Sequence, residues 1–121
     1  MSKTALVVDD STSMRQMVSF TLQSIGFDTI EGGNGCEALE AAGEKPLDLV
    51  ITDLNMPEMD GITLIRELRA KPTYKFTPIL LLTTESQEQK KQEGKAAGAT
   101  GWMVKPFNTD QLLTVVRKVV K

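Results

Sequence analysis

The sequence contains no histidine and only one cysteine, Cys36, among its 121 residues. Without histidine, the chain cannot build a Ser–His or Cys–His nucleophile pair, a histidine-ligated zinc site or a phosphohistidine. One cysteine forms neither an internal disulfide nor a multi-cysteine metal site. Because Cys36 follows a glycine-rich turn, we interpret it as a small residue near a helix start. If this chain handles phosphate covalently, a carboxylate must do it.

The sequence also lacks a long apolar segment and a strong charge of one sign. No stretch is long enough to span a bilayer, and the first strand-like run begins at Thr4, so we expect no signal peptide. The 14 basic and 16 acidic residues are interspersed and give a net charge of −2, which offers no general attraction to nucleic acid or membranes. We expect a cytoplasmic protein with one domain over residues 1–121 and no DNA-binding effector domain.

Four short apolar runs are each followed by a charged or hydroxyl-bearing residue. They are Thr4 to Val8 followed by Asp9 and Asp10, Leu49 to Thr52 followed by Asp53, Pro78 to Leu82 followed by Thr83 and Thr84, and Gly101 to Val104 followed by Lys105. Such runs predict strands buried on both faces, where an ionised carboxylate is tolerated only at the exposed end. If the strands are parallel, these polar groups meet at one edge of the sheet.

The segments between the strands have the apolar spacing of amphipathic helices. We expect helices after the capping residues at 11–13, after Asn34, after the turn-rich loop 56–61, over 86–97, and after Asn108 or Thr109, with a further strand over 27–31. The first helix should close at Gly26 and the second at Pro46, and residues 71–77 form a polar connection. This alternation predicts an α/β fold with five parallel strands and helices on both faces.

Two of the expected helices are unusual. The segment 86–97 is polar nearly all round and contains Gly94, which predicts a marginal helix. The last helix carries apolar residues over an arc of about 160°, wider than the ~100° stripe that a core-facing helix needs. Either part of this apolar surface is exposed for a partner, or neighbouring elements cover it.

The groups at the strand ends suggest a phosphate site. The carboxylates of Asp9, Asp10 and Asp53 would repel one another by on the order of 4 kcal/mol per pair at ~4 Å and an effective dielectric constant of about 20. A hard divalent cation with oxygen ligands, such as Mg²⁺, would neutralise them. Lys105 supplies a fixed positive charge, and Thr83 a hydroxyl that can bond a phosphoryl oxygen. Asp53 would then act as a nucleophile towards phosphorus and form an aspartyl-phosphate.

Longer motifs surround these groups. They are Val7-Val8-Asp9-Asp10-Ser11, the segment from Asp53 to Gly61, Thr83, and Lys105-Pro106-Phe107. Together they resemble the signature of the receiver domain of bacterial two-component response regulators, and the likeness covers the entire chain. It is greatest to the CheY-like single-domain chemotaxis regulators. The resemblance implies a flavodoxin-like, doubly wound (βα)5 fold with strand order 2-1-3-4-5.

The resemblance also assigns roles at the acidic edge. It implies that Asp53 accepts a phosphoryl group from a histidine kinase or a small phosphodonor, and that the domain catalyses this transfer without being a conventional turnover enzyme. It implies that Asp10, Asp53 and the backbone carbonyl of Asn55 bind Mg²⁺, with Asp9 assisting through water.

Further roles follow from the same resemblance. Thr83 and Lys105 would engage the phosphoryl group, and Trp102 would swing inward when Thr83 moves towards it. The face built from helix 86–97, the last strand and the last helix would then change its affinity for a target. Two positions depart from the pattern: the family usually has tyrosine or another smaller ring where this chain has Trp102, and the best-known chemotaxis regulators have tryptophan where it has Leu54.

We therefore expect a phosphorylation-dependent switch whose target is a flagellar motor switch protein, with a histidine kinase as a further partner. The sequence also permits a phosphatase as a partner and does not identify one. A phosphate sink or phosphorelay intermediate without a motor target is the alternative. A haloacid-dehalogenase-type phosphatase is disfavoured because Asn55 stands where such enzymes have a general acid Asp, and a nucleotide-binding module lacks its Gly-rich loop. We expect a monomer that can dimerise weakly through its last helix.

Overall fold

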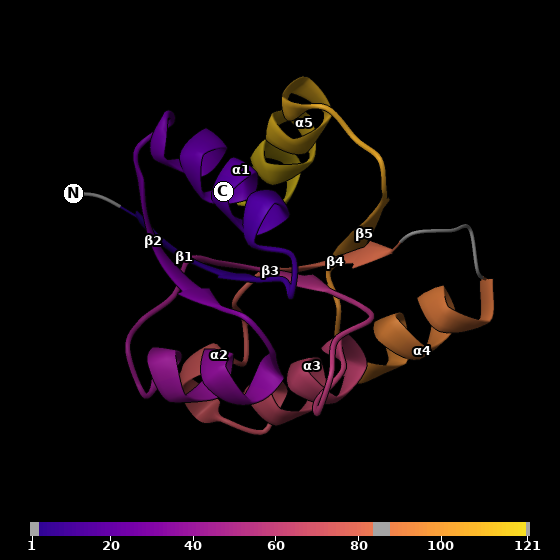
Figure 1. The fold of residues 1–121 in the computed structure, drawn as a ribbon. Helices are drawn as coiled ribbons and strands as arrows, with labels where there is room; N and C mark the ends of the chain where they lie inside the picture. The colour runs from indigo at the N-terminus through magenta and orange to yellow at the C-terminus, as the bar shows by residue number, and fades with distance from the viewer. Residues whose placement is uncertain (1–2, 84–87, 121) are drawn as a thin grey trace.

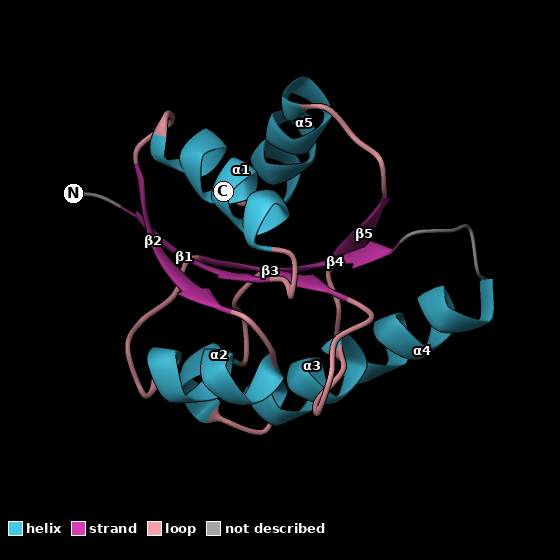
Figure 2. Cartoon of the chain, viewed as in Figure 1, coloured by secondary structure: helices cyan, strands magenta, loops and turns pink. Residues whose placement is uncertain are grey.

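A five-stranded parallel sheet lies between two layers of helices (Figures 1 and 2). The structure is a computed structural model that describes residues 3–83 and 88–120. The strands are β1 (Lys3–Val8), β2 (Phe27–Gly32), β3 (Leu49–Asp53), β4 (Ile79–Thr83) and β5 (Gly101–Val104). The helices are α1 (Thr12–Gln23), α2 (Gly35–Ala42), α3 (Gly61–Arg69), α4 (Glu88–Ala97) and α5 (Thr109–Val119).

The strand order is β2-β1-β3-β4-β5, and every neighbouring pair is parallel. Helices α1 and α5 cover one face of the sheet, and α2, α3 and α4 cover the other (Figure 1). This confirms the expected α/β, flavodoxin-like, doubly wound arrangement. Strand order reverses between β1 and β3, which is where ligands bind in open sheets of this kind.

The central strands are buried on both faces, as their continuous apolar composition predicts. Every residue of β3 and β4 is buried. Alternate side chains serve two separate cores: Ile51 and Leu82 pack with α1 and α5, whereas Val50 and Leu81 pack with α2 and α3. Burial of this extent makes the sheet a rigid base for the polar groups at its carboxyl edge.

Each helix start that the sequence predicts and that lies within the described residues has a side-chain cap. Ser11, Asn34, Asp60 and Asn108 accept hydrogen bonds from backbone N–H groups of α1, α2, α3 and α5. Asn108 forms a capping box with Gln111, so Asn108, not Thr109, caps the last helix. The fourth helix was expected to start at Ser86, which lies outside the described residues. Thr84, predicted to follow the fourth strand, lies outside them too.

Two helices end earlier than the sequence suggests. Helix α1 ends at Gln23, three residues before Gly26, which follows in a left-handed conformation with φ of 99°. Helix α2 ends at Ala42 and not near Pro46, because Gly43 adopts a φ of 54° and stops it. The early ends leave short connections that lead directly into β2 and β3.

The connection between α3 and β4, expected to be polar, contains a buried aromatic residue. Pro72–Tyr74 forms a 3-10 turn in which the side chain of Tyr74 is fully buried. Its hydroxyl donates a hydrogen bond to the carbonyl of Lys45 at 2.7 Å. The ring is therefore accommodated in the core while its polar end keeps a partner.

The wide apolar stripe of α5 is only partly covered. Leu112 and Val116 are buried, whereas Leu113, Val115 and Val119 are half-buried. Part of the stripe therefore stays accessible, as one of the two readings of the sequence expects. None of the helices in the described part of the chain has the length and apolar character needed to cross a bilayer.

Gly61 fixes the distance between α3 and the end of β3. A Cβ atom at Gly61 would collide with the backbone carbonyl oxygen of Asp53 and lie 3.1 Å from Cα of Leu54. We expect Gly61→Ala to lower the free energy of unfolding by on the order of 3 kcal/mol because the backbone must shift. Gly101→Ala is the matched control, since its Cβ would meet only Leu80 Cδ2 at 3.5 Å. Urea titrations of both variants test this, and equal stabilities would contradict it.

Candidate functional site

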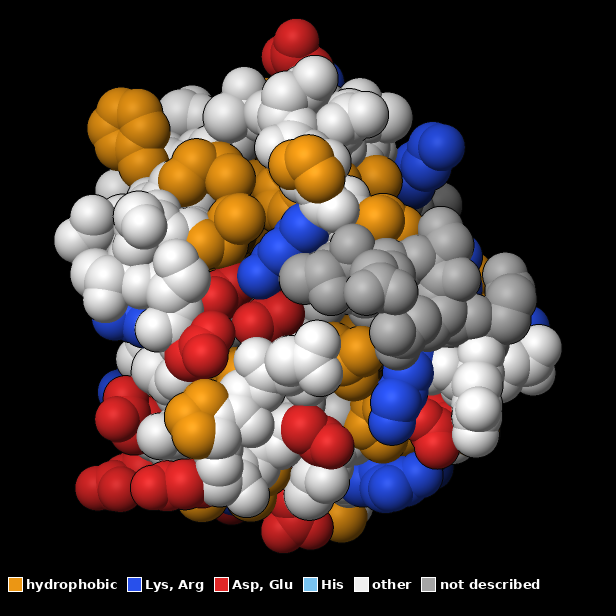
Figure 3. Space-filling model, turned by 45° about the vertical axis from the view of Figure 1, so that its right-hand side comes forward, with side chains coloured by type: hydrophobic (Ala, Val, Ile, Leu, Met, Phe, Trp, Pro, Cys, Tyr) orange, Lys and Arg blue, Asp and Glu red, His pale blue; other side chains and the backbone are white. Residues whose placement is uncertain are grey.

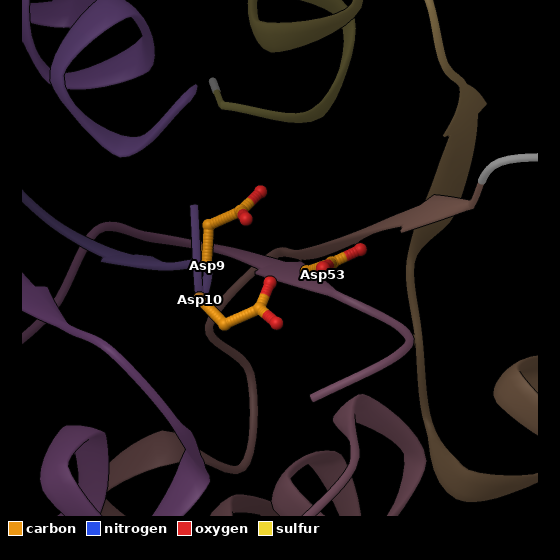
Figure 4. Close-up of side chains that lie close together, drawn as sticks. All are labelled: Asp9, Asp10 and Asp53. Atoms are coloured by element: carbon orange, nitrogen blue, oxygen red, sulfur yellow. The ribbon is translucent and has the colours of Figure 1, made fainter. Parts of the chain in front are cut away.

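Three carboxylates converge at the carboxyl edge of the sheet. Asp9 and Asp10 follow β1, and Asp53 is the last residue of β3. One carboxylate oxygen from each residue lies within 4.8 Å of the other two (Figure 4). Asp9 and Asp53 are buried, whereas Asp10 is exposed. The register places them there, because Val8 pairs with Thr52 and the next residue of each strand reaches the same edge.

Lys105 is the counter-charge of this cluster. Its Nζ lies 3.0 Å from Asp9 Oδ2 and 3.2 Å from Asp53 Oδ1, and its side chain is only 14% exposed. Lys105 directly follows β5 and is 96 residues from Asp9 in sequence. One half-buried cation therefore contacts two of the three carboxylates.

The surroundings of Asp53 and Lys105 shift the pKa values of both groups. Burial raises the pKa of Asp53 above its usual value, and the negative charge of Asp9 raises it further, although Lys105 acts in the opposite direction. Burial would by itself lower the pKa of Lys105. Its hydrogen bond to Asp9 and the charges of Asp53 and Asp9 outweigh burial, so the pKa of Lys105 is raised and the amine stays charged. Asp53 is thus a carboxylate whose charge one lysine does not fully offset.

The atoms that face the cluster suit a hard cation. Asp53 Oδ1 is buried and makes no hydrogen bond among the described residues, apart from its ion pair with Lys105. Asp10 makes no side-chain hydrogen bond or ion pair to any described residue, so its oxygens are available to a ligand. Oxygen atoms are the donors that small divalent cations prefer. The residues present therefore fit such an ion.

The remaining residues predicted from the sequence lie at different distances from the cluster. Thr83 is buried at the end of β4, where it pairs with Val104 of β5, so it lies on the same edge as the carboxylates. Asn55 is exposed in the loop after β3, two residues beyond Asp53. Trp102 lies within β5, is 39% exposed, and has Lys91 Nζ of α4 5.5 Å from its ring centre. Trp102 therefore belongs to an outer surface and not to the acidic edge.

Two contacts at the site were not predicted. The backbone N–H of Ser11 donates to Asp9 Oδ1 at 2.9 Å, and Arg15 Nη1 donates to the backbone carbonyl of Asp9 at 2.7 Å. A basic residue in the first turn of the helix that follows an acidic pair is a signal that could have revealed Arg15, since that turn packs against the strand end.

Figure 3 shows how the cluster sits on the surface. Acidic side chains gather in a hollow beside a basic side chain, and apolar side chains lie along one border. Asp10 is exposed beside the buried Asp53, so the cluster extends to the surface. A carboxylate cluster with a fixed cation beside it suits the binding of charged groups.

Comparison with known families agrees with this geometry. Residues 5–117 match the family described as the response regulator receiver domain. The chain belongs to this family. Receiver domains are regulatory domains and not conventional enzymes, and family membership implies a histidine kinase partner and a downstream target.

Relatives of this receiver domain have different outputs. It is 37% identical over 115 residues to chemotaxis protein CheY-3 of Vibrio cholerae. The aligned residues cover 94% of this chain and 88% of the relative. The solved structure of the chemotaxis response regulator CheY4 of Vibrio cholerae is 50% identical, with a TM-score of 0.93 and coverage of 98% and 99%. Transcriptional regulatory protein SrrA of Staphylococcus aureus is 36% identical over 121 residues, and this chain covers 49% of it.

The raised pKa of Asp53 makes the receiver domain less stable when this group ionises. A raised pKa in the folded state means that the contribution of Asp53 to stability is complete below the unfolded value of 3.8 and is lost as the pH rises through the folded value. We therefore expect Asp53→Asn to raise the Tm of the metal-free protein at pH 7 by a few degrees, the shift that about 1 kcal/mol produces in a domain of this size.

Melting curves at several pH values with a chelator present test this expectation. The gain from Asp53→Asn should shrink as the pH falls towards 4, because the wild-type carboxyl is then protonated. Asp28→Asn removes an exposed carboxylate from β2 and is the matched control, with little change in Tm at any pH. A lower Tm for Asp53→Asn at pH 7 would mean that Lys105 stabilises the ionised Asp53 by more than burial and Asp9 destabilise it.

Proposed function

We propose that residues 1–121 form a single receiver domain that accepts a phosphoryl group on Asp53 and so switches its affinity for a target. The observation that carries this proposal is the convergence of three carboxylates and one half-buried lysine at the carboxyl edge of the sheet. Asp53 is the proposed acceptor because it ends the central strand and is paired with the lysine.

The transfer is a displacement at phosphorus. A carboxylate oxygen of Asp53 attacks the phosphorus atom and forms an O–P bond, while the P–N bond to a phosphohistidine of the kinase, or the P–O bond of a small acyl phosphate, breaks. The departing group keeps the electron pair of the broken bond. Lys105 and the hydroxyl of Thr83 would hold phosphoryl oxygens, so the negative charge is balanced without a proton moving to Asp53.

Mg²⁺ is the proposed cofactor. Asp10, Asp53 and the backbone carbonyl of Asn55 would hold the ion, with Asp9 acting through water. When bound, it would neutralise the clustered carboxylates and offset the charge of the incoming phosphoryl group. The oxygen-only donor set and the ligand atoms lying within 4.8 Å of one another support this assignment.

The output surface proposed here is the face made by α4, β5 and α5. Strand β5 is an edge strand on which Trp102 and Val104 are 39% and 37% exposed. Beside it, an open groove of about 540 Å³ runs between β5 and α5 and is bordered by Phe107 and Val115. Movement of Thr83 towards the phosphoryl group would be followed by Trp102, which lies on the adjacent strand.

A flagellar motor switch protein is the proposed target, and the similarity of the chain to two chemotaxis proteins supports this choice. This places the protein in the cytoplasm, with a histidine kinase as donor. A phosphate sink or phosphorelay intermediate is the second candidate, because α4 is strongly polar and offers few apolar groups to a target. The phosphatase alternative is disfavoured by Asn55, which cannot act as a general acid.

Phosphorylation can be measured directly by intact mass. After incubation with acetyl phosphate, we expect one added phosphoryl group on the wild-type protein with Mg²⁺ and little or none without it. Asp53→Asn should gain none, because an amide is not a nucleophile towards phosphorus. A stable adduct on another residue of Asp53→Asn would overturn the assignment of Asp53. No adduct from acetyl phosphate or from histidine kinases would overturn the proposed function.

The target can be tested with a labelled peptide from a flagellar motor switch protein and fluorescence anisotropy. Phosphorylation should increase affinity about tenfold or more, and Trp102→Ala should remove most of this gain, since it deletes an exposed aromatic anchor. Phe20→Ala is the control, because Phe20 is 74% exposed but lies on α1. Equal, weak binding with and without phosphorylation would favour the sink or relay.

A further inference from the structure

Arg15 joins the acidic turn to the neighbouring strand β2. Its side chain, in the first turn of α1, is only 19% exposed. Its Nη1 donates to the backbone carbonyl of Asp9 at 2.7 Å, and its Nε donates to Glu31 Oε1 at 3.0 Å. Arg15 is thus fixed between a backbone acceptor at the site and a carboxylate on the adjacent strand.

The bond from Arg15 acts on the peptide unit that leads to Asp10. Three other hydrogen bonds fix Asp9: its N–H donates to the carbonyl of Gly32 at 3.2 Å, and its carboxylate accepts from the N–H of Ser11 and from Nζ of Lys105. None of these bonds restrains the carbonyl of Asp9, whose orientation sets the direction in which the chain continues into Asp10. Figure 4 shows Asp10 directly after Asp9, with its carboxylate turned towards Asp53.

Asp10 depends on this restraint more than its neighbours do. Asp9 and Asp53 are buried and paired with Lys105, whereas Asp10 is exposed and its side chain makes no hydrogen bond or ion pair to any described residue. No side-chain contact with a described residue fixes its carboxylate, so the backbone determines which positions the carboxylate can reach. Loss of the Arg15 bond would free the Asp9–Asp10 peptide to rotate.

The positive charge of Arg15 has an effect on cation binding opposite to that of its restraint on the Asp9–Asp10 peptide. A cation near three carboxylates repels a second cation, so removing the charge would by itself strengthen the binding of a divalent ion. Glu31 offsets this repulsion because it forms an ion pair with the same guanidinium. A positioning role and a purely electrostatic role for Arg15 therefore predict opposite changes in cation affinity.

We propose that Arg15, held by Glu31, is a positioning residue that orients the Asp9–Asp10 peptide so that Asp10 can share a Mg²⁺ ion with Asp53. This proposal rests on the proposed function of the site. It gives Arg15 an effect on metal affinity and none on the chemistry at phosphorus, since the guanidinium bonds the backbone and not the acceptor.

Titration calorimetry with Mg²⁺ on the full chain tests the proposal. Arg15→Met should weaken Mg²⁺ binding about tenfold or more, the usual effect of removing a group that orients a metal ligand. Arg15→Lys should restore part of the affinity because an ammonium can still donate to the carbonyl of Asp9. Arg69→Met is the matched control: Arg69 also donates to backbone carbonyls, at Gly98 and Tyr74, but on the far layer of the fold.

Unchanged or tighter Mg²⁺ binding by Arg15→Met would overturn the proposal in favour of an electrostatic role or none. If Arg15→Met does not fold, the same titration of Glu31→Ala decides, because Arg15 then loses the carboxylate that holds its guanidinium. Wild-type hydrogen exchange at the Asp9 and Ser11 amides together with wild-type affinity in that variant would count against positioning. At saturating Mg²⁺, the rate of phosphorylation of Arg15→Met should return to the wild-type rate. A lower rate at saturation would assign Arg15 to the chemistry and overturn the proposal.

The same measurements separate this proposal from the proposed function. A wild-type protein that binds no Mg²⁺ and gains no phosphoryl group would reject the function of the site as a whole. A wild-type protein that does both, with an Arg15→Met variant that matches it at every Mg²⁺ concentration, would reject the positioning role alone.

Discussion

The repulsion between buried carboxylates is the constraint on which the rest of the site depends. Asp9 and Asp53 lie at neighbouring strand ends, away from water, and a single lysine contacts both. Each ionised carboxylate raises the energy of the other, and burial strengthens this effect because the surroundings screen charge poorly. The fold tolerates the arrangement because two hydrophobic cores hold the strands in place from both sides. The resulting site has an unbalanced negative charge that a cation can relieve.

The backbone around the site is held by contacts that involve no carboxylate repulsion. Gly61 lets α3 approach the carbonyl of Asp53, and Asp60 caps that helix. Ser11 caps α1 and also bonds Asp9 through its N–H, while Arg15 bonds the carbonyl of the same residue. These contacts fix the turn in the metal-free protein. Preorganisation of this kind spares the site a rearrangement when a charged group arrives.

The proposed output surface lies at the opposite end of the sheet order from β2. Strand β5 carries Trp102 at the surface, and Lys91 from α4 lies over its ring. Helix α4 is polar and packs closely at Gly94, where a Cβ would lie 2.7 Å from Leu81 Cδ2. A helix with few apolar contacts is easily displaced. Thr83 and Lys105 end the two strands beside it, so the acidic edge and this surface share β4 and β5.

The sequence by itself determined the order of strands and helices along the chain, the cap at Asn34, the cap positions to within residues 11–13 and 108–109, and the acidic and basic groups at the strand ends. These features are local, because they depend on apolar periodicity and on short-range hydrogen bonds. Only the tertiary structure decided that Lys105 contacts Asp9 across 96 residues, that Arg15 bonds the backbone of Asp9, and that Tyr74 is buried in a connection expected to be polar. Such contacts depend on the register of the sheet and the packing of distant elements, which no local pattern encodes.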